Sequence, residues 1–263
     1  MRHLWAFVQR LGAFVLLSLL SAPLAAQSSR DPILVPEVSQ ANIVLRQGFT
    51  GTELLLYGAL LDPRGQRADA VYDVVIVLKG PTEPIRLREK AQVAGVWVNA
   101  DSTAYRSVPS FYALASSRPV AEIVDERTAA IYELGLEYLQ LSPTGTINPE
   151  EQTRFSAGLV DLRARQGLYA QYDGAVSINQ GVLYSARLPI PSNVRPGRYI
   201  AETFAIADGR VVVSATAEVQ VSKEGFEGFV ATEAEENAFL YGLFAIALSL
   251  FMGWAAGRLY AYV

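Results

Sequence analysis

The sequence has no cysteine and almost no histidine or methionine. Its one histidine is His3 and its two methionines are Met1 and Met252, so the long stretch from residue 4 to residue 251 contains none of these three residue types. Their side chains supply the soft and imidazole ligands of zinc, blue-copper and c-type haem sites. Their absence predicts a domain without metal or cofactor, and it excludes disulfide bonds and Ser-His-Asp or Cys-His catalysis.

Lysine is also scarce. The only lysines are Lys79, Lys90 and Lys223, and the 263-residue chain carries a formal net charge of -4. No tract rich in Lys and Arg is present, which argues against nucleic acid as a partner. Carboxylates, hydroxyls and arginines are the side chains that remain for chemistry.

Two apolar runs lie at opposite ends of the chain. Residues 1–26 combine a positive start, an apolar stretch at 11–20 and small residues before Gln27, a pattern typical of a cleaved signal peptide. The alternative is an uncleaved anchor, which would give a two-span hairpin. Residues 238–257 form a run of 20 residues without a charge, the length that a helix needs to cross a bilayer.

These two runs set the expected organisation and location of the chain. We expect a signal peptide at 1–26, a periplasmic β-rich domain at 27–221, a linker at 222–237, a transmembrane helix at 238–257 and a cytoplasmic tail at 258–263. The protein would then pass once through the bacterial inner membrane, with the bulk of its chain in the periplasm. The lipid bilayer is therefore its first expected partner.

Most of the region between the apolar runs has the pattern of β-strands. Residues 71–78 form a nearly continuous β-branched run, typical of a strand buried on both faces, and Asp208-Gly209 between two alternating stretches predicts a hairpin. Helix signals are confined to about residues 119–167, where Asp125 and Asn148 are candidate N-caps. The sequence predicts a mainly β fold, an antiparallel immunoglobulin-like β-sandwich with a helical insertion, followed by one C-terminal transmembrane helix.

Candidate binding residues lie in the first half of the β-rich region. Arg86, Arg88 and Lys90 occupy alternate positions, so a strand would carry all three cations on one face. That face is either a small anion-binding site or an ordinary solvated surface. We expect the chain to turn at the polar residues 99–102 that follow.

Aromatic and cationic side chains give two further expectations. An aromatic cleft and simple core packing are the alternative interpretations of Trp97, Phe111 and Tyr112. Three arginines of the helix expected after Asn148 should face away from the core, and these are Arg154, Arg163 and Arg165.

Small residues recur at every fourth position of the expected membrane span. They are Ala245, Ser249, Gly253 and Gly257. This spacing places them along one ridge of a helix, where a second helix can approach closely. The ridge would dock a membrane permease or a second copy of the chain, and the alternative is chance, because small residues are common in spans.

Short motifs spread along the chain resemble those of one known family. They lie at residues 48–51, 79–81, 95–99, 111–117, 166–169 and 241–242. In their order and spacing, from about Ile33 to Leu259, the sequence is similar to the alphaproteobacterial transmembrane protein family, single-pass periplasmic proteins of unknown function. The resemblance implies an inner-membrane anchor and an accessory role beside permeases of the sulfite-exporter type, and it implies no catalytic residues.

Two classes of function remain open at this point. The first, which the missing catalytic side chains favour, is a non-enzymatic accessory or scaffold protein that assists a sulfite-type anion exporter. The second is a periplasmic hydrolase or lyase that uses two carboxylates facing each other across a cleft. The carboxylate candidates, among which no spacing selects a pair, are Asp69, Asp73, Glu83, Asp101 and Glu122.

Overall fold

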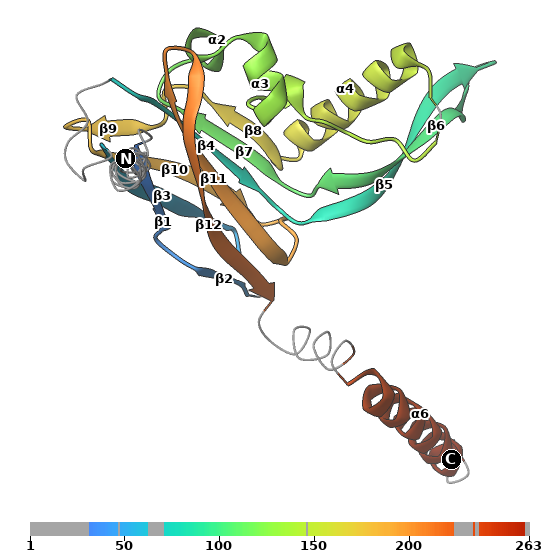
Figure 1. Cartoon of the computed structure of the whole chain (residues 1–263). Coiled ribbons are helices and arrows are strands. Elements are labelled where there is room, and N and C mark those ends of the chain that lie inside the picture. Colours follow the sequence, from blue (N-terminus) through green and yellow to red (C-terminus); the bar gives the residue numbers. More distant parts are fainter. Residues whose placement is uncertain are drawn as a thin grey trace, which may run out of the picture. The chain divides into compact units, whose positions relative to one another are not determined.

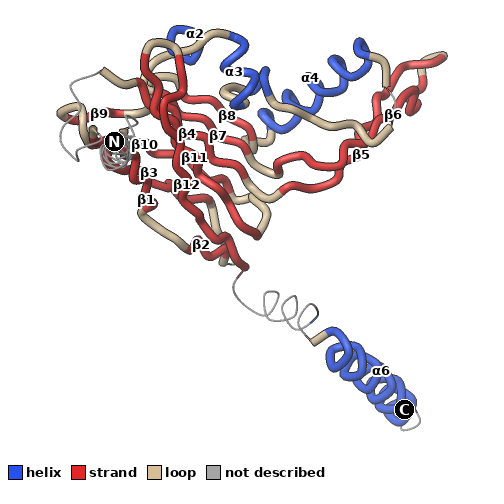
Figure 2. Tube along the Cα trace, in the orientation of Figure 1, coloured by secondary structure: helices blue, strands red, loops and turns tan. Residues whose placement is uncertain are grey.

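The computed structural model describes residues 32–46, 48–62, 71–145, 147–223, 234 and 237–260. Within them the protein is mainly β, with helices in the middle of the sequence and one apolar helix at the C-terminal end (Figures 1 and 2). The prediction of a mainly β fold with a C-terminal apolar helix is thus confirmed. The expected signal peptide at 1–26 and the candidate Asp69 lie outside the described residues.

The first sheet has four strands in the order β1-β3-β10-β9, with all neighbours antiparallel. Its strands are β1 (Ile33–Val38), β3 (Gly51–Leu61), β9 (Ser177–Asn179) and β10 (Leu183–Pro191). Tyr184, Ala186 and Leu188 of β10 are buried while the side chain of Arg187 between them is exposed. This alternation gives the sheet one buried face.

The second sheet has six strands in the order β2-β12-β11-β4-β7-β8. Its strands are β2 (Asn42–Leu45), β4 (Asp73–Lys79), β7 (Tyr112–Ser116), β8 (Tyr169–Tyr172), β11 (Gly197–Ala207) and β12 (Arg210–Lys223). The prediction of purely antiparallel pairing is wrong here, because β2 runs parallel to β12 and β7 parallel to β8. Parallel partners lie far apart in sequence, so no local turn reveals them.

The two sheets share one hydrophobic core. Residues 74–78 of β4 are all 0% exposed, and β4 lies between β11 and β7. This strand is covered on both faces, as its continuous β-branched run predicts. Each fully buried side chain of this kind stabilises the fold by roughly 1.5–3 kcal/mol relative to leaving it in water.

Helices occupy the middle of the sequence. They are α2 (Val120–Ile123), α3 (Glu126–Tyr132), the 3-10 turn η1 (Leu136–Tyr138) and α4 (Pro149–Arg165). The predicted N-caps are confirmed, since the Asp125 and Asn148 side chains accept hydrogen bonds from the N–H groups of Thr128 and Glu151, at 2.9 and 2.8 Å. Helix α3 is capped at its C-terminal end by Glu133, whose backbone is left-handed with φ 53°.

Helix α3 and the turn after it cover one face of the second sheet (Figure 1). The hydroxyl of Tyr112 on β7 donates to the carbonyl of Glu133 (2.7 Å) and accepts from the N–H of Gly135 (3.0 Å). Burial raises the pKa of Tyr112 well above its usual range. The rings of Tyr132 and Phe204 meet edge to face with centroids 5.5 Å apart. These contacts fix the helices on the sheet.

Two hairpin turns test the turn predictions. Asp208 and Gly209, with φ 49° and 74°, join β11 to β12, as predicted. The predicted turn at 99–102 is wrong, because these residues lie within β6 (Val96–Pro109). The chain turns instead at Ala94 and Gly95, with φ 50° and 84°. Alanine is uncommon at positive φ, so composition favoured the polar residues downstream.

Strands β5 (Thr82–Val93) and β6 pair only with each other among the described strands, in a long two-stranded hairpin that we call the arm. The two larger sheets together with α2, α3 and η1 are called the body. In Figures 1 and 2 the arm extends beyond the body and runs beside α4.

The C-terminal helix α6 spans Ala238–Tyr260, three residues beyond the predicted end of the span at Gly257. Its stretch Tyr241–Arg258 is long and apolar enough to cross a membrane, and none of it is buried against the protein. Strand β12 continues through Lys223, so the first two residues of the predicted linker belong to the sheet.

Candidate functional site: the arm and helix α4

The inner face of the arm packs on α4 through a small hydrophobic cluster separate from the main core. Its buried members are Tyr105, Val108, Leu141, Phe155 and Leu159, with Ile85 and Leu87 of β5 packed against them. The Tyr105 hydroxyl also lies 3.1 Å from the Ser156 hydroxyl of α4. Because β5 alternates half-buried and exposed residues, only one of its faces takes part in this packing.

An ion-pair clamp holds the root of the arm. Glu83 at the start of β5 pairs with Arg163 of α4 and with Arg195 before β11, with 2.5 Å between the paired atoms in each case. The side chains of Glu83 and Arg163 are only 11% and 14% exposed. The expectation that Arg163 faces solvent is therefore wrong, because its partner lies 80 residues away in the sequence.

A second ion-pair group lies farther along the arm. Arg154 of α4 reaches both Glu89 and Asp101, at 3.1 Å each, and these two acids oppose each other across the arm. Arg165 pairs with Asp161 on its own helix at 2.9 Å. Arg154 and Arg165 are exposed as expected, and Arg154 also bridges the helix and the arm through its two ion pairs.

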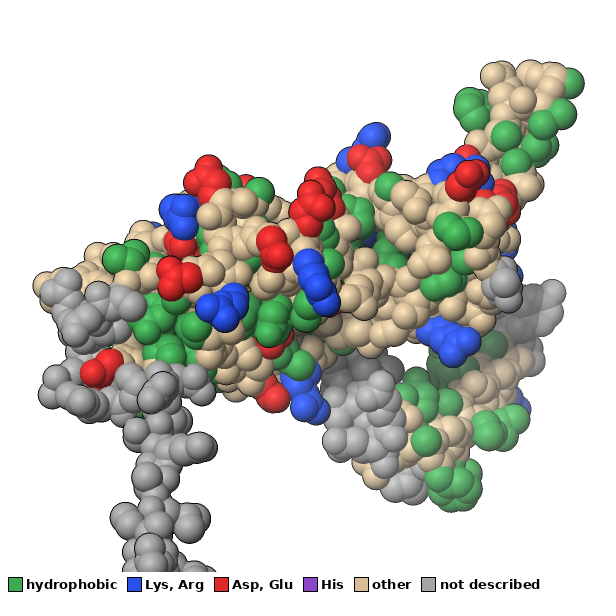
Figure 3. All heavy atoms as spheres, turned by 45° about the horizontal axis from the view of Figure 1, so that its top comes forward, with side chains coloured by type: hydrophobic (Ala, Val, Ile, Leu, Met, Phe, Trp, Pro, Cys, Tyr) green, Lys and Arg blue, Asp and Glu red, His purple; other side chains and the backbone are tan. Residues whose placement is uncertain are grey.

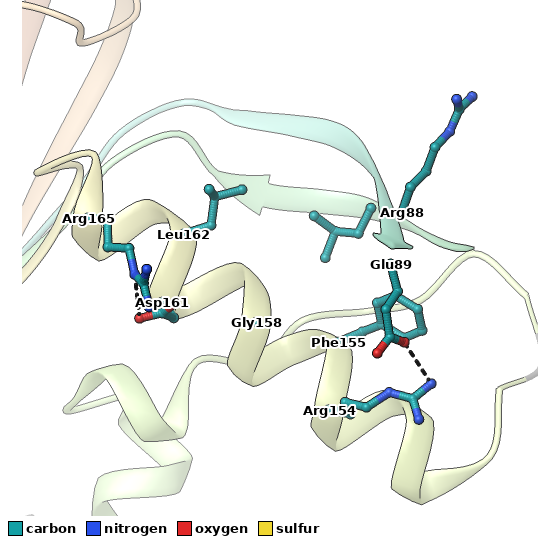
Figure 4. Close-up of a pocket in the computed structure, with 9 residues that line it drawn as sticks. Arg88, Glu89, Arg154, Phe155, Gly158, Asp161, Leu162 and Arg165 are labelled. Carbon is teal, nitrogen blue, oxygen red and sulfur yellow. Dashed lines mark hydrogen bonds and ion pairs between the residues drawn. The ribbon is translucent and has the colours of Figure 1, made fainter. Parts of the chain in front are cut away.

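The outer face of the arm carries the predicted row of cations. Arg86, Arg88 and Lys90 are exposed at alternate positions of β5. None of the three forms an ion pair within the part of the chain that the structure describes. Figure 4 shows the Arg88 side chain pointing away from α4. The row is thus open to an anionic partner.

The tip of the arm is apolar. Val93, Val96 and Trp97 are 58%, 63% and 65% exposed, and Val98 is 40% exposed. Residues 91–100 contain no charged side chain. In Figure 3 the outer end of the arm, at the upper right, carries hydrophobic side chains and no charged ones.

A hollow of about 410 Å³ lies between β5 and α4 (Figure 4). Four of its charged lining residues form ion pairs, Glu89 with Arg154 and Asp161 with Arg165, and Arg88 lines its edge without one among the described residues. The remaining lining includes Leu87, Phe155 and Leu162. Two further hollows, of about 610 and 640 Å³, lie beside α4 and α3.

Of the two interpretations of the aromatic residues, core packing holds for Phe111 and Tyr112, and no cleft joins them to Trp97. Phe111 and Tyr112 are 1% and 0% exposed in the body, and Phe111 packs on Tyr199 with ring centroids 5.9 Å apart. Trp97 lies at the arm tip. Phe111 and Tyr112 are buried together with the apolar residues of β7, whereas nothing in the described residues covers Trp97.

The candidate carboxylates that the structure describes are all held by arginines. The Asp73 carboxylate accepts hydrogen bonds from Arg118 and from the Ser117 hydroxyl. These bonds lower the pKa of Asp73 below its usual range, and the bond from Arg118 has the larger effect. A carboxylate oxygen of Glu122 lies 3.7 Å from a guanidinium nitrogen of Arg118. Glu83 and Asp101 are in the arm clusters above. No group of three or more potential metal ligands occurs among the described residues.

The ridge residues of α6 are exposed. A Cβ built on Gly253 or Gly257 would meet nothing within 4 Å, so this side of the helix is open. The Ser249 hydroxyl donates to the carbonyl of Ala245 at 2.8 Å, one turn earlier. The ridge therefore exists as a row of small residues, and its use as a docking surface stays a prediction.

A β-rich domain followed by an apolar helix of spanning length, the one candidate span among the described residues, is the pattern of a single-pass membrane protein. The chain belongs to the family described as "Putative transmembrane protein (Alph_Pro_TM)", whose profile matches residues 33–261. This match confirms the family resemblance of the sequence motifs. No curated protein matches the chain in sequence.

Sequence reasoning missed the arm as a unit. The Glu83 clamp joins residues 80 or more positions apart, so no local pattern could reveal it. The sequence did contain one signal of the tip, because the uncharged stretch 91–100 contains an isolated tryptophan, Trp97, two residues after Gly95. A two-residue turn at Ala94 and Gly95 would have exposed that tryptophan at a hairpin end.

Proposed function

We propose that the protein is a membrane-anchored accessory or scaffold protein, which presents its arm to a membrane permease that exports an anion of the sulfite type. The observation that carries the proposal is the row Arg86, Arg88 and Lys90. Three cations without ion-pair partners among the described residues stand on the outer face of a braced arm. Guanidinium and ammonium groups in such a row suit an oxyanion or an acidic surface of a partner.

The paired carboxylates favour this proposal over a hydrolase or lyase. A general acid needs a raised pKa, whereas arginine and serine hydrogen bonds lower the pKa of Asp73. Glu83, held between Arg163 and Arg195, serves the packing of the arm. Carboxylates used in this way support an architectural role.

We also propose that the body is an immunoglobulin-like sandwich. The orders β1-β3-β10-β9 and β12-β11-β4 correspond to the A-B-E-D and G-F-C orders of that fold. Near the start of β11, the Tyr199 hydroxyl donates to the carbonyl of Arg195, four residues upstream, at 2.8 Å, like a tyrosine corner. Burial raises the pKa of Tyr199 to about 12. An experimental structure in which the two sheets do not face each other would refute this.

The proposed location is the inner membrane, with residues 27–237 in the periplasm after removal of residues 1–26. The support is the sequence pattern of the leader together with α6 as the single described span. Alkaline phosphatase fused after Ser222 should be active and a fusion after Val263 inactive. The reverse pattern would put the domain in the cytoplasm.

Affinity capture of the full-length protein in mild detergent tests the accessory role. We expect a polytopic permease to co-purify with the wild type, and recovery to fall strongly in the variant Arg86→Gln/Arg88→Gln/Lys90→Gln. The matched control Arg127→Gln/Arg187→Gln/Arg210→Gln removes three exposed cations from the body and should recover the partner normally. Equal recovery with both variants, or no permease with the wild type, would reject the proposal.

Calorimetry addresses the anion itself. Titration of the full chain in detergent with sulfite or sulfate at millimolar concentration should give heat that is lost at high salt and in the triple Gln variant of the row. An absence of heat with the wild type would make the row an ordinary solvated surface.

A further inference from the structure

We propose that the tip of the arm inserts into the bilayer that α6 spans, as a second and reversible membrane contact of the same chain. This goes beyond the proposed function, because it needs no partner protein. It rests on the exposed apolar tip, on the charges behind it and on the span itself.

The tip has the composition of an interfacial membrane anchor. Val93 and Val96 oppose each other at the end of the hairpin, and Trp97 opposes Gln92 one step behind. Each of the three apolar side chains is more than half exposed. Valine favours the acyl region and the tryptophan ring favours the boundary between lipid and water.

The charges behind the tip match an anionic lipid surface. Lys90, Gln92 and Trp97 share the outer face of the arm, because cross-strand partners and alternate residues point to the same side. At a rise of about 3.3 Å per residue, Lys90 lies about 10 Å behind Val93. Insertion of the tip by roughly 5–10 Å would therefore bring Lys90 to the phosphate groups.

The nearest acidic side chains do not oppose this contact. Glu89 and Asp101 both pair with Arg154 of α4, which offsets one of their two negative charges. As cross-strand partners they also lie on the face of the arm that packs on α4, opposite the cation row. The outer face consequently presents Arg86, Arg88 and Lys90 toward a negative surface.

A bilayer fits this tip better than a second protein does. A stable protein interface buries roughly 800 Å² on each partner, more than four side chains at a hairpin end supply. Lipid needs no complementary surface. The chain's own span also keeps the domain beside a bilayer, which raises the effective concentration for a weak contact.

The absence of cysteine makes a depth measurement direct. The variant Val96→Cys carries one thiol, which can be labelled with a polarity-sensitive fluorophore in the full chain. The labelled protein is reconstituted in vesicles of phosphatidylethanolamine and phosphatidylglycerol with doxyl groups on the acyl chains. Ser214→Cys, at an exposed position of β12, is the matched control.

We expect acyl-chain quenching and a blue shift for the label at 96 and neither for the label at 214. Because each cation near an anionic surface changes the insertion equilibrium by about fivefold, Lys90→Gln should lower the ratio of inserted to free arm about fivefold, and Arg86→Gln less. Replacing phosphatidylglycerol with phosphatidylcholine should act in the same direction.

Two results would overturn the proposal. One is a label at 96 that stays as water-exposed as the label at 214. The other is protection that appears only at high protein-to-lipid ratio without acyl-chain quenching, which would show a contact with a second copy. Because these vesicles contain no permease and the capture experiment contains no bilayer, failure of one proposal does not entail failure of the other.

Discussion

The body and the arm are both built from β-strands, but they differ in how far the strand faces are buried. In the body, β4 is covered on both faces and residues 74–78 are fully buried. In the arm, one face of β5 packs on α4 and the other faces solvent, and the apolar side chains at the hairpin tip are exposed. The apolar residues of the body are buried and stabilise the fold, whereas the arm leaves cations and apolar side chains exposed. Exposed groups that add nothing to the fold indicate a surface for contact.

The largest expected difference between the two regions is in the cost of losing a leucine. Leu78→Ala in β4 should lower the free energy of unfolding by about 3–4 kcal/mol, because its side chain is 0% exposed and leaves a cavity. Leu87→Ala, half-buried in the arm, should cost only about 1 kcal/mol. Denaturant unfolding of the full chain in detergent measures both, and equal costs would remove the distinction between body and arm.

The ion-pair clamp at Glu83 should affect the stability of the arm and leave that of the body unchanged. Glu83→Gln leaves Arg163 largely buried without its charge partner, so we expect a local destabilisation of about 3 kcal/mol. Hydrogen exchange should accelerate at amides of β5 and β6 and stay unchanged in β4. The control Glu218→Gln, in an exposed pair with Arg198 at 3.7 Å, should change little. Faster exchange throughout the body would show that the arm is part of the main core.

Acid should lower the stability of the body by protonating Asp73. Its pKa is lowered in the folded protein, so its ion pair stabilises the fold above the ordinary value of 3.8 and the contribution is lost as pH falls below 3.8. Asp73→Asn should therefore be less stable than the wild type at neutral pH, and the two should converge in acid. Thermal unfolding from pH 7 to pH 2 measures the difference, and a gap that widens on acidification would contradict this sign.

Much of the body follows from local patterns. The buried run of β4, the Asp208-Gly209 turn and the caps Asp125 and Asn148 each depend on residues within one short window, so the sequence reveals them. The parallel pairs of the second sheet depend on chain segments far apart, so local reasoning predicts the wrong direction.

The candidate site divides in the same way. The common face of Arg86, Arg88 and Lys90 needs only strand alternation and was predictable. The burial of Arg163, the turn at Ala94 and the separation of Trp97 from Phe111 depend on tertiary packing or on an unusual backbone angle. The tertiary contacts leave no local mark in the sequence, and the turn leaves only Gly95 and the uncharged stretch around it.

The smallest expected effect on the folded domain comes from the span. Gly253→Ile should weaken self-association or partner capture while insertion and domain stability stay unchanged, because a bulky side chain closes the open ridge. Leu250→Ile should have little effect. Cross-linking in native membranes that recovers oligomer or partner equally from Gly253→Ile and the wild type would leave α6 as a simple tether.

The most direct test of the account compares contact by the two regions in place. A photo-reactive amino acid is introduced at residue 88 on the arm or at residue 214 on the body, both exposed, in the full chain in native membranes. We expect adducts with another membrane protein from position 88 and only background from position 214. Adducts of equal yield from both positions, or from position 214 alone, would contradict the assignment of contact to the arm.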